Sequence, residues 1–211
     1  MKAVHIIEAR GVPLDRSDVD TDQIIPSDWL KRVERTGFGR GLFSEWRDDP
    51  AFVLNQPEYQ GAEILIGGAR FGTGSSREHA VWALMDYGFT AVVASSFGDI
   101  FKNNSSKQGL VTVEVSPSAL DELLALVRET PSTIITIDVA QGTIEVAEHD
   151  WRSDFSLSPM TRERLLNGWD DIGLSLRHDA DIARYEAGVD IRRPSLAGLF
   201  DAEGRALQSS H

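Results

Sequence analysis

The sequence predicts an α/β protein whose central sheet is partly parallel. Residues 63–67 and 91–95 form two short apolar runs, typical of strands buried in a sheet. Between them, residues 75–87 have the length and spacing of a helix, closed by the glycine that follows. A strand, a helix and a second strand in this order form a βαβ unit, whose two strands are parallel. Residues 133–139 and 143–147 predict an antiparallel hairpin beside this unit.

The first 60 residues predict irregular structure around the sheet. Residues 1–26 alternate short apolar pieces with four aspartates, which predicts edge strands joined by a loop. Residues 27–60 carry six aromatic residues and three glycines among charges, without a sustained period. This pattern predicts a long ordered loop with short helices, and such long loops are usually functional.

The rest of the chain continues the alternation of helices and strands. A Ser-Pro pair begins a helix at residue 116 and again at residue 158, because serine caps a helix start and proline suits its first turn. We expect further elements at residues 99–105, 110–115, 116–128, 151–157, 158–168 and 180–187. Residues 1–188 are expected to form the folded domain, and residues 189–211 an exposed tail.

Composition and charge exclude several classes of protein. The 211 residues are 41% hydrophobic, enough for one large domain with its own core. Cysteine is absent, which excludes disulfides, zinc–thiolate sites, cysteine nucleophiles and an iron–sulfur cluster ligated by this chain alone. With 21 Lys and Arg against 33 Asp and Glu, the net charge is −12, so nucleic acid and anionic membranes are poor partners. We find no signal peptide or membrane span and expect a cytoplasmic protein.

One segment carries the residues of a candidate site. Residues 70–79 read Arg-Phe-Gly-Thr-Gly-Ser-Ser-Arg-Glu-His and join a predicted strand to a predicted helix, where α/β proteins place ligand sites. Gly72 and Gly74 are supporting residues that let a ligand approach the backbone, and N–H groups at a helix start attract carboxylates. The segment matches neither a phosphate-binding P-loop, nor a dinucleotide fingerprint, nor a hydrolase elbow.

Two interpretations of this helix start remain open. Ser75 and Glu78 match the capping box S-x-x-E, which would serve only the stability of the helix. A cap does not explain Arg77, because a cation in the first helical turn opposes the helix dipole unless an anion lies between them. The alternative is a binding site for an anionic substrate.

The motifs resemble a known family. Residues 74–80, Gly-Ser-Ser-Arg-Glu-His-Ala, are similar to the signature of the swivelling domain of the aconitase superfamily. The stretches 19–26 (Val-Asp-Thr-Asp-Gln-Ile-Ile-Pro), 42–47 (Leu-Phe-Ser-Glu-Trp-Arg) and 97–105 resemble the small-subunit family of 3-isopropylmalate dehydratase. The resemblance implies a swivelling β/β/α domain and a hydro-lyase of leucine biosynthesis. That enzyme converts 2-isopropylmalate to 3-isopropylmalate by dehydration and rehydration.

The resemblance also implies a division of labour between two chains. In this family a large subunit supplies three cysteines that hold a [4Fe-4S] cluster, which acts as a Lewis acid. This chain would then bind no metal itself and would be active only in a heterodimer with that subunit. The absence of cysteine agrees with this expectation. The substrate would be a small dicarboxylate.

By the same resemblance, four residues line the active site. Ser75 is the catalytic base, and Asp22 orients the site or shuttles protons. Ser76 and Arg77 bind the substrate carboxylates, because a planar guanidinium matches a carboxylate with both of its prongs. Asp22 is one of four neighbouring aspartates, so its alternative interpretation is a solvated loop charge.

Three further residues are candidates with ordinary alternatives. Arg47 is a second carboxylate contact or a surface arginine paired with a neighbouring acid. His79 follows Ser75 by four residues on the same predicted helical face, and it orients the site or is a packed structural histidine. Asn103 supports the active-site loop or caps backbone groups.

Two other functions stay open. Citraconate hydratase and homoaconitase share the Gly-Ser-Ser-Arg motif and differ mainly in the loop near residues 27–47. A contact there discriminates by only about 1–3 kcal/mol per methylene, so the sequence does not settle the substrate. The chain could also be a non-catalytic carboxylate-binding or regulatory module. Turnover on adding a cluster-bearing partner separates an enzyme from such a module.

Overall fold

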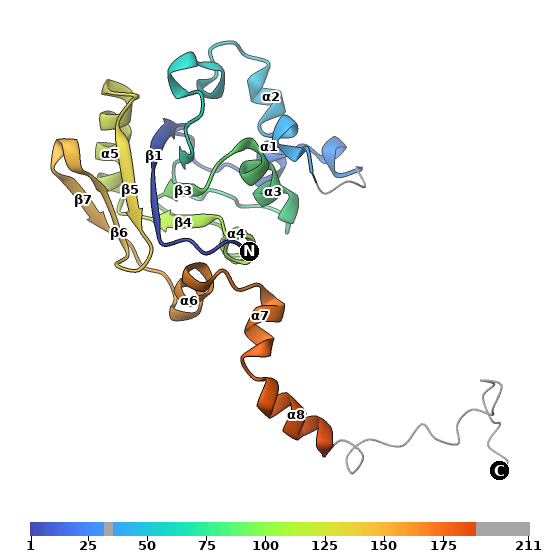
Figure 1. Ribbon diagram of the computed structural model, residues 1–211. Helices are drawn as coiled ribbons and strands as arrows, with labels where there is room; N and C mark the ends of the chain where they lie inside the picture. Colours follow the sequence, from blue (N-terminus) through green and yellow to red (C-terminus); the bar gives the residue numbers. More distant parts are fainter. Residues whose placement is uncertain (32–35, 189–211) are drawn as a thin grey trace. The chain divides into compact units, whose positions relative to one another are not determined.

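The computed structural model describes residues 1–31 and 36–188 (Figure 1). Backbone contacts divide the chain into two units, Met1–Asp170 and Asp171–His211. The first unit contains the sheet, and the second contains two short helices, α7 (Asp171–Leu176) and α8 (Asp179–Ala187). The tail expected at residues 189–211 lies outside the described residues, so the domain boundary at residue 188 stays a prediction.

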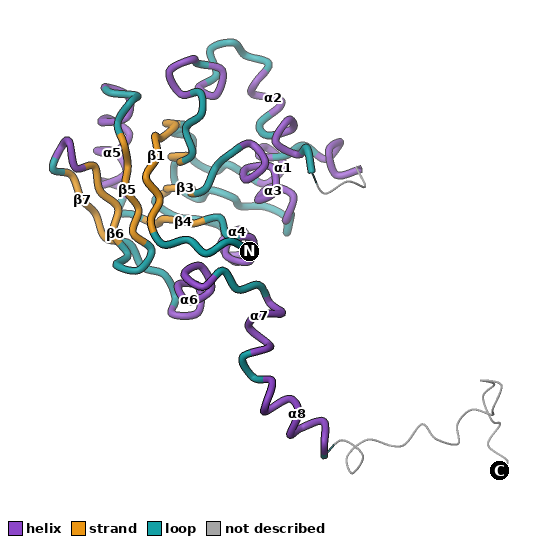
Figure 2. The backbone as a smooth tube through the Cα atoms, in the orientation of Figure 1, coloured by secondary structure: helices purple, strands orange, loops and turns teal. Residues whose placement is uncertain are grey.

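The first unit is built around a sheet of seven strands in the order β4-β3-β2-β1-β5-β6-β7 (Figure 2). Neighbouring strands from β1 to β4 pair in parallel, and β5 to β7 extend the sheet in antiparallel fashion from the other side of β1. The predicted fold class, βαβ unit and hairpin are therefore confirmed. The strands are β1 (Ile6–Pro13), β2 (Ile64–Ile66), β3 (Ala91–Ala94), β4 (Val111–Glu114), β5 (Ile134–Asp138), β6 (Thr143–Val146) and β7 (Trp151–Asp154).

The N-terminal region corrects one prediction. The expected edge strands are a single eight-residue strand, β1, in the middle of the sheet, where it joins the parallel and antiparallel halves. Burial alternates at its start and becomes continuous from Gly11 onward, so only its first half has the pattern of an exposed strand. Ile24 lies in a short helix, α1 (Thr21–Ile24), instead of a strand.

The longer helices lie close to their predicted positions. Ser116 and Ser158 cap two of them, since their Oγ atoms accept from the N–H groups of Ala119 (3.2 Å) and Thr161 (3.1 Å). Helix α7 was not predicted, because six residues that include a glycine give little periodicity. No described helix is long and apolar enough to cross a membrane. The remaining α-helices are α2 (Ser44–Arg47), α3 (Glu78–Tyr87), α4 (Asp99–Gln108), α5 (Pro117–Glu129) and α6 (Pro159–Asn167).

Two hydrophobic cores form on the two faces of the sheet. Leu65 and Val92 belong to one core, together with residues of α3 and α4. Ile66 and Val93 belong to the other, together with residues of α5 and the antiparallel strands. Because successive strand residues point to opposite faces, β2 and β3 must be apolar throughout.

The segment between α1 and β2 is an ordered loop with short helices, as predicted, in its described part. Phe38, Phe43 and Phe52 are buried in the core beneath α3, and their burial anchors this loop. Besides α2, the segment contains 3₁₀ helices η1 (Ser27–Lys31), η2 (Phe38–Gly41), η3 (Val53–Asn55) and η4 (Pro57–Tyr59).

Candidate functional site

The glycine-rich loop follows β2 at its carboxyl end, the edge where parallel sheets carry ligand sites. Two neighbouring segments hold it by backbone hydrogen bonds. Gly72 N donates to Val19 O (2.7 Å), and Thr73 O accepts from Thr21 N (2.9 Å). On the other side, Gly98 N donates to Phe71 O (2.9 Å). The loop between β2 and α3 is therefore fixed between the start of α1 and the start of α4.

Gly72 and Gly74 support the loop as expected. Both have positive φ angles, +74° and +96°, which favour glycine. A Cβ atom on Gly72 would lie 2.3 Å from Cγ of Phe101 in α4, too close for any side chain. Gly98 is equally constrained, because its Cβ would lie 2.5 Å from the carbonyl oxygen of Gly72. This close approach lets α4 support the loop.

Helix α3 begins at Glu78, three residues later than predicted, and this difference overturns the capping box. Arg77 is the N-cap residue, with extended backbone (φ −116°, ψ 100°) and no side-chain cap. Glu78 Oε1 accepts from Gln108 Nε2 at 2.5 Å, at the end of α4. The carbonyl of Ser75 accepts from Thr21 Oγ1 (3.1 Å), which holds this residue outside the helix. Ser75 is thus no helix cap, and its side chain is exposed.

Arg77 and Asp22 form an ion pair between the loop and α1. The Arg77 side chain is only 20% exposed and its Nη1 atom is buried, whereas the Asp22 side chain is 55% exposed. An arginine at a helix start requires a nearby anion because the helix dipole opposes its charge, and Asp22 supplies that anion. The structure therefore brings together Asp22, Ser75, Ser76 and Arg77, which lie on two segments more than 50 residues apart in the sequence.

The neighbouring aspartates also have definite partners, which argues against simple solvated loop charges. Asp15 and Asp18 pair with Arg128 and Arg70. Asp20 is the N-cap of α1 and forms a true capping box with Gln23. Asp15 and Asp18 thus connect the loop that carries Asp22 to distant segments, and Asp20 stabilises the start of α1.

His79 and Asn103 do not face the loop in the expected way. Because α3 begins at Glu78, His79 and Ser75 do not share a helical face. The His79 ring instead packs against Phe38 and Trp82, with ring centroids 5.3 and 4.7 Å away. Asn103, in the middle of α4, lines a separate hollow with residues 156–158 of the segment before α6.

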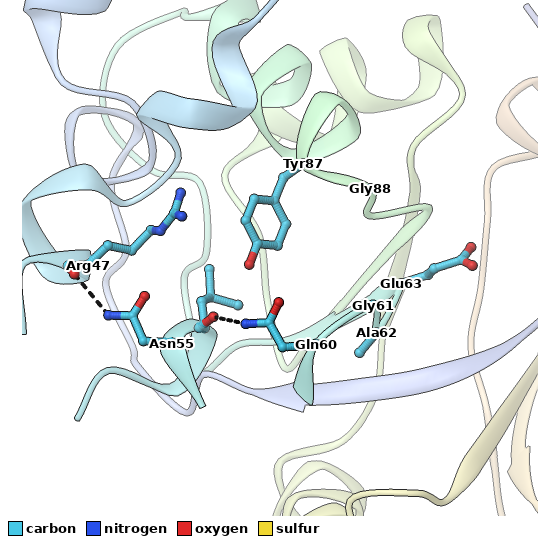
Figure 3. Close-up of a pocket in the computed structure, with 9 residues that line it drawn as sticks. Arg47, Asn55, Gln60, Gly61, Ala62, Glu63, Tyr87 and Gly88 are labelled. Atoms are coloured by element: carbon cyan, nitrogen blue, oxygen red, sulfur yellow. Dashed lines mark hydrogen bonds between the residues drawn. The ribbon is translucent and has the colours of Figure 1, made fainter. Parts of the chain in front are cut away.

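Arg47 lies at the other end of α3 from Arg77. Its guanidinium lies 5.4 Å from the ring centroid of Tyr87, the last residue of α3, and its Nη1 donates to Gly39 O at 3.5 Å. Ten residues of helix separate Tyr87 from Arg77, which corresponds to about 15 Å. Arg47, Tyr87 and Asn55 line a hollow of about 600 Å³. Figure 3 shows Arg47 and Tyr87 pointing into it. The structure does not bring Arg47 to the glycine-rich loop.

The described residues of this chain do not fit a metal or an iron–sulfur cluster. The sequence contains no cysteine. Within residues 1–31 and 36–188, no group of three His, Asp or Glu side chains is placed to hold a metal ion. The chemistry that this chain can supply is carboxylate binding by Arg77 and proton transfer at exposed hydroxyl and carboxylate groups.

Three residues around the loop were not predicted. Thr21 holds Ser75, Gln108 holds Glu78, and Gly98 allows the close contact with Gly72. Thr21 and Gly98 lie in the stretches 19–26 and 97–105 that resemble the family, and this resemblance was their only signal. Gln108 acts through a contact between distant segments, for which one sequence has no signal.

Comparisons with known proteins place this chain in a class. Residues 1–118 match the family model described as the aconitase C-terminal domain. A solved structure of 3-isopropylmalate dehydratase from Methanocaldococcus jannaschii has the same fold, with a TM-score of 0.62 and 23% identity. The match covers 85% of this chain and 99% of that one. The first unit is therefore a swivelling domain of the aconitase type, as expected.

Closer relatives define the particular family. The 3-isopropylmalate dehydratase small subunit of Rubrobacter xylanophilus is 56% identical over 186 residues, which is 88% of this chain and 94% of the relative. That of Frankia casuarinae is 52% identical over 197 residues, covering 93% of this chain and all of the relative. Residues 171–198 match the model for the C-terminal domain of the 3-isopropylmalate dehydratase small subunit. The chain belongs to the family of 3-isopropylmalate dehydratase small subunits, and the expected resemblance is confirmed.

Proposed function

We propose that this chain, with a large subunit, converts 2-isopropylmalate to 3-isopropylmalate by dehydration and rehydration in the cytoplasmic synthesis of leucine. The observation that carries the proposal is identity above 50% to small subunits of this enzyme over about nine-tenths of the chain. The ion pair of Arg77 with Asp22 beside two exposed serines supports it, because such a loop suits a dicarboxylate.

The large subunit is proposed to hold the [4Fe-4S] cluster. This chain has no cysteine, and its described residues include no group that could hold a metal ion, so we confine its proposed contribution to groups that bind the substrate or move protons. The roles of these groups are derived from their positions around the glycine-rich loop.

Arg77 is proposed to bind one substrate carboxylate. Its side chain is only 20% exposed, and its charge is already neutralised by one carboxylate, that of Asp22. A planar guanidinium can bind a carboxylate through two parallel hydrogen bonds, which fixes the orientation of the substrate. The exposed hydroxyl of Ser76, one residue earlier, is proposed to donate to the same substrate.

Ser75 is proposed to be the base. In the dehydration direction the Ser75 alkoxide takes the proton from the carbon beside a carboxylate, and the C–H electrons form the double bond. The substrate hydroxyl group leaves as hydroxide, which is protonated to water as the Ser75 alkoxide is regenerated. Rehydration then adds the hydroxyl group to the carbon that lost the proton, and a proton to the carbon that lost the hydroxyl group. Because Ser75 lies before the first turn of α3, we assign the stabilisation of its anionic form to Arg77 instead of the helix N–H groups. Asp22 is proposed to set the position of Arg77.

Reconstitution tests this function. The purified chain is mixed with a cluster-loaded large subunit, and turnover is measured with 2-isopropylmalate, citraconate and homoaconitate. We expect turnover with both chains present, none with either alone, and the highest kcat/KM with 2-isopropylmalate. Turnover by this chain alone would refute the division of labour. Assembly without turnover on any of the three substrates would support a non-catalytic module, and a preference for citraconate or homoaconitate would reassign the substrate.

A further inference from the structure

The second unit contains two short helices with apolar side chains in solvent. None of the described residues of α7 and α8 is buried. Ile172 and Leu176 of α7 are 71% and 63% exposed, and Ile182 and Tyr185 of α8 are 39% and 54% exposed. These four residues are called the apolar stripe below.

The spacing of the stripe places its residues on one face of each helix. Ile172 and Leu176 are four residues apart, and Ile182 and Tyr185 are three apart, so each pair lies on one side of its helix. In α8, Arg184 pairs with Asp181 at 3.0 Å on another side. Helix α8 is thus amphipathic, which is typical of helices that bury one face against another surface.

Both helices are short, so they need a surface to pack against. Helices α7 and α8 have six and nine residues. Isolated helices shorter than about 12–15 residues are marginal in water, so their stability comes from packing of the apolar face. The described part of the unit provides no buried side chain that could supply this packing.

We propose that the apolar stripe docks onto the large subunit, an inference that rests on the proposed function. The aconitase C-terminal domain model covers residues 1–118, while residues 171–198 match a separate model named for the small subunit of this enzyme. The segment is therefore characteristic of chains that occur as separate small subunits. A separate subunit must bind its partner without a covalent connection, and an amphipathic helical segment recognised in a hydrophobic groove supplies such binding.

The test compares two double variants of the full chain. Ile182→Glu with Tyr185→Glu places charges in the stripe, and Ala180→Glu with Ala187→Glu places the same charges on the opposite side of α8. The Kd for the cluster-loaded large subunit is measured by calorimetry, and kcat is measured at saturating small subunit. We expect the stripe variant to bind at least tenfold more weakly with kcat retained at saturation, and the control to bind within about twofold of wild type.

Hydrogen exchange distinguishes the large subunit from the other surfaces that could cover the stripe. We expect the amides of residues 171–188 to exchange rapidly in the free chain at every concentration and slowly with the large subunit. Slow exchange in the dilute free chain would mean that the stripe packs on its own chain, and slowing with concentration would mean a second copy. Either result, or equal Kd values for both variants, overturns the docking proposal. Failure of wild type to turn over with saturating large subunit would instead refute the proposed function.

Discussion

Arg77 in the loop before α3 is paired with Asp22 in α1, and the two partners differ in burial. The Arg77 side chain is 20% exposed and the Asp22 side chain 55% exposed. Leaving a buried charge without a partner is far more costly than exchanging one partner for another. A substrate carboxylate that approaches from solvent can share or replace Asp22 while Arg77 stays neutralised. The pair therefore keeps Arg77, the cation proposed to bind the substrate, in place before the substrate arrives.

Arg77→Lys keeps the charge and removes the fork of hydrogen-bond donors. We expect KM for 2-isopropylmalate to rise at least tenfold in the reconstituted enzyme, because a lysine binds a carboxylate as a point charge. The matched control is Arg47→Lys, at the far end of α3, for which we expect KM and kcat within about twofold of wild type. Steady-state kinetics at saturating large subunit measure both. A large KM increase in the control with none in Arg77→Lys would exchange the roles of the two arginines.

Asp22→Asn tests whether the ion pair positions Arg77. Asp22→Asn leaves Arg77, whose side chain is only 20% exposed, without its anionic partner, but Asp22 itself is more than half exposed, so we expect an intermediate stability loss of about 1–3 kcal/mol in urea unfolding. We expect kcat to fall at least tenfold, because the guanidinium of Arg77 is less ordered without its partner. KM should not rise, because Asp22 no longer competes with the substrate carboxylate for Arg77. An unchanged kcat would remove Asp22 from the catalytic machinery and leave it a structural partner of Arg77.

The fold was largely predictable because its elements depend on local patterns. The run of residues 64–66, the glycine after α3 and the Ser-Pro pair at α5 each carry their own signal. Strand β1 was misplaced because the position of a strand in a sheet depends on which distant strands pair with it. The sequence alone could not reveal this pairing.

The candidate site shows the same limit. The motif at residues 74–80 located the loop, yet its local pattern predicted a helix start at Ser75. The hydrogen bond from Thr21 and the packing of Gly72 against α4 keep this stretch out of the helix. Arg47 was grouped with the loop by resemblance, and only the path of α3 separates them. Contacts between remote segments thus set both the start of α3 and the position of Arg47.

Ser75→Ala separates the two roles that its position suggested. Ser75 caps no helix, so we expect the free energy of unfolding to change by less than about 0.5 kcal/mol, as for an ordinary surface substitution. Turnover should fall by roughly 10² to 10⁴, the usual contribution of a positioned base. The neighbouring Ser76→Ala is the control, because its expected effect is a higher KM with a smaller loss of kcat. If Ser75→Ala slows turnover less than tenfold, another group is the base.

Gly72→Ala tests the contact that supports the loop. An alanine here would adopt a φ of +74° and place its Cβ 2.3 Å from the ring of Phe101. We expect a loss of about 2–4 kcal/mol in the free energy of unfolding, from a strained backbone together with overpacking. Turnover at saturating large subunit should fall as well, because the displaced loop carries Ser75 and Arg77. Urea unfolding and steady-state kinetics measure the two effects.

Gly61→Ala is the matched control for this collision. Gly61 has nearly the same φ, +73°, but its nearest neighbour would be the end of the Arg10 side chain at 3.7 Å. We therefore expect Gly61→Ala to lower the free energy of unfolding by the backbone strain alone, about 1 kcal/mol, and to leave turnover unchanged. The difference between the two losses in free energy of unfolding isolates the contact of the loop with α4. Adding Phe101→Leu to Gly72→Ala should restore part of the lost stability. Equal losses in Gly72→Ala and Gly61→Ala would show that Phe101 gives way freely and that α4 does not fix the loop.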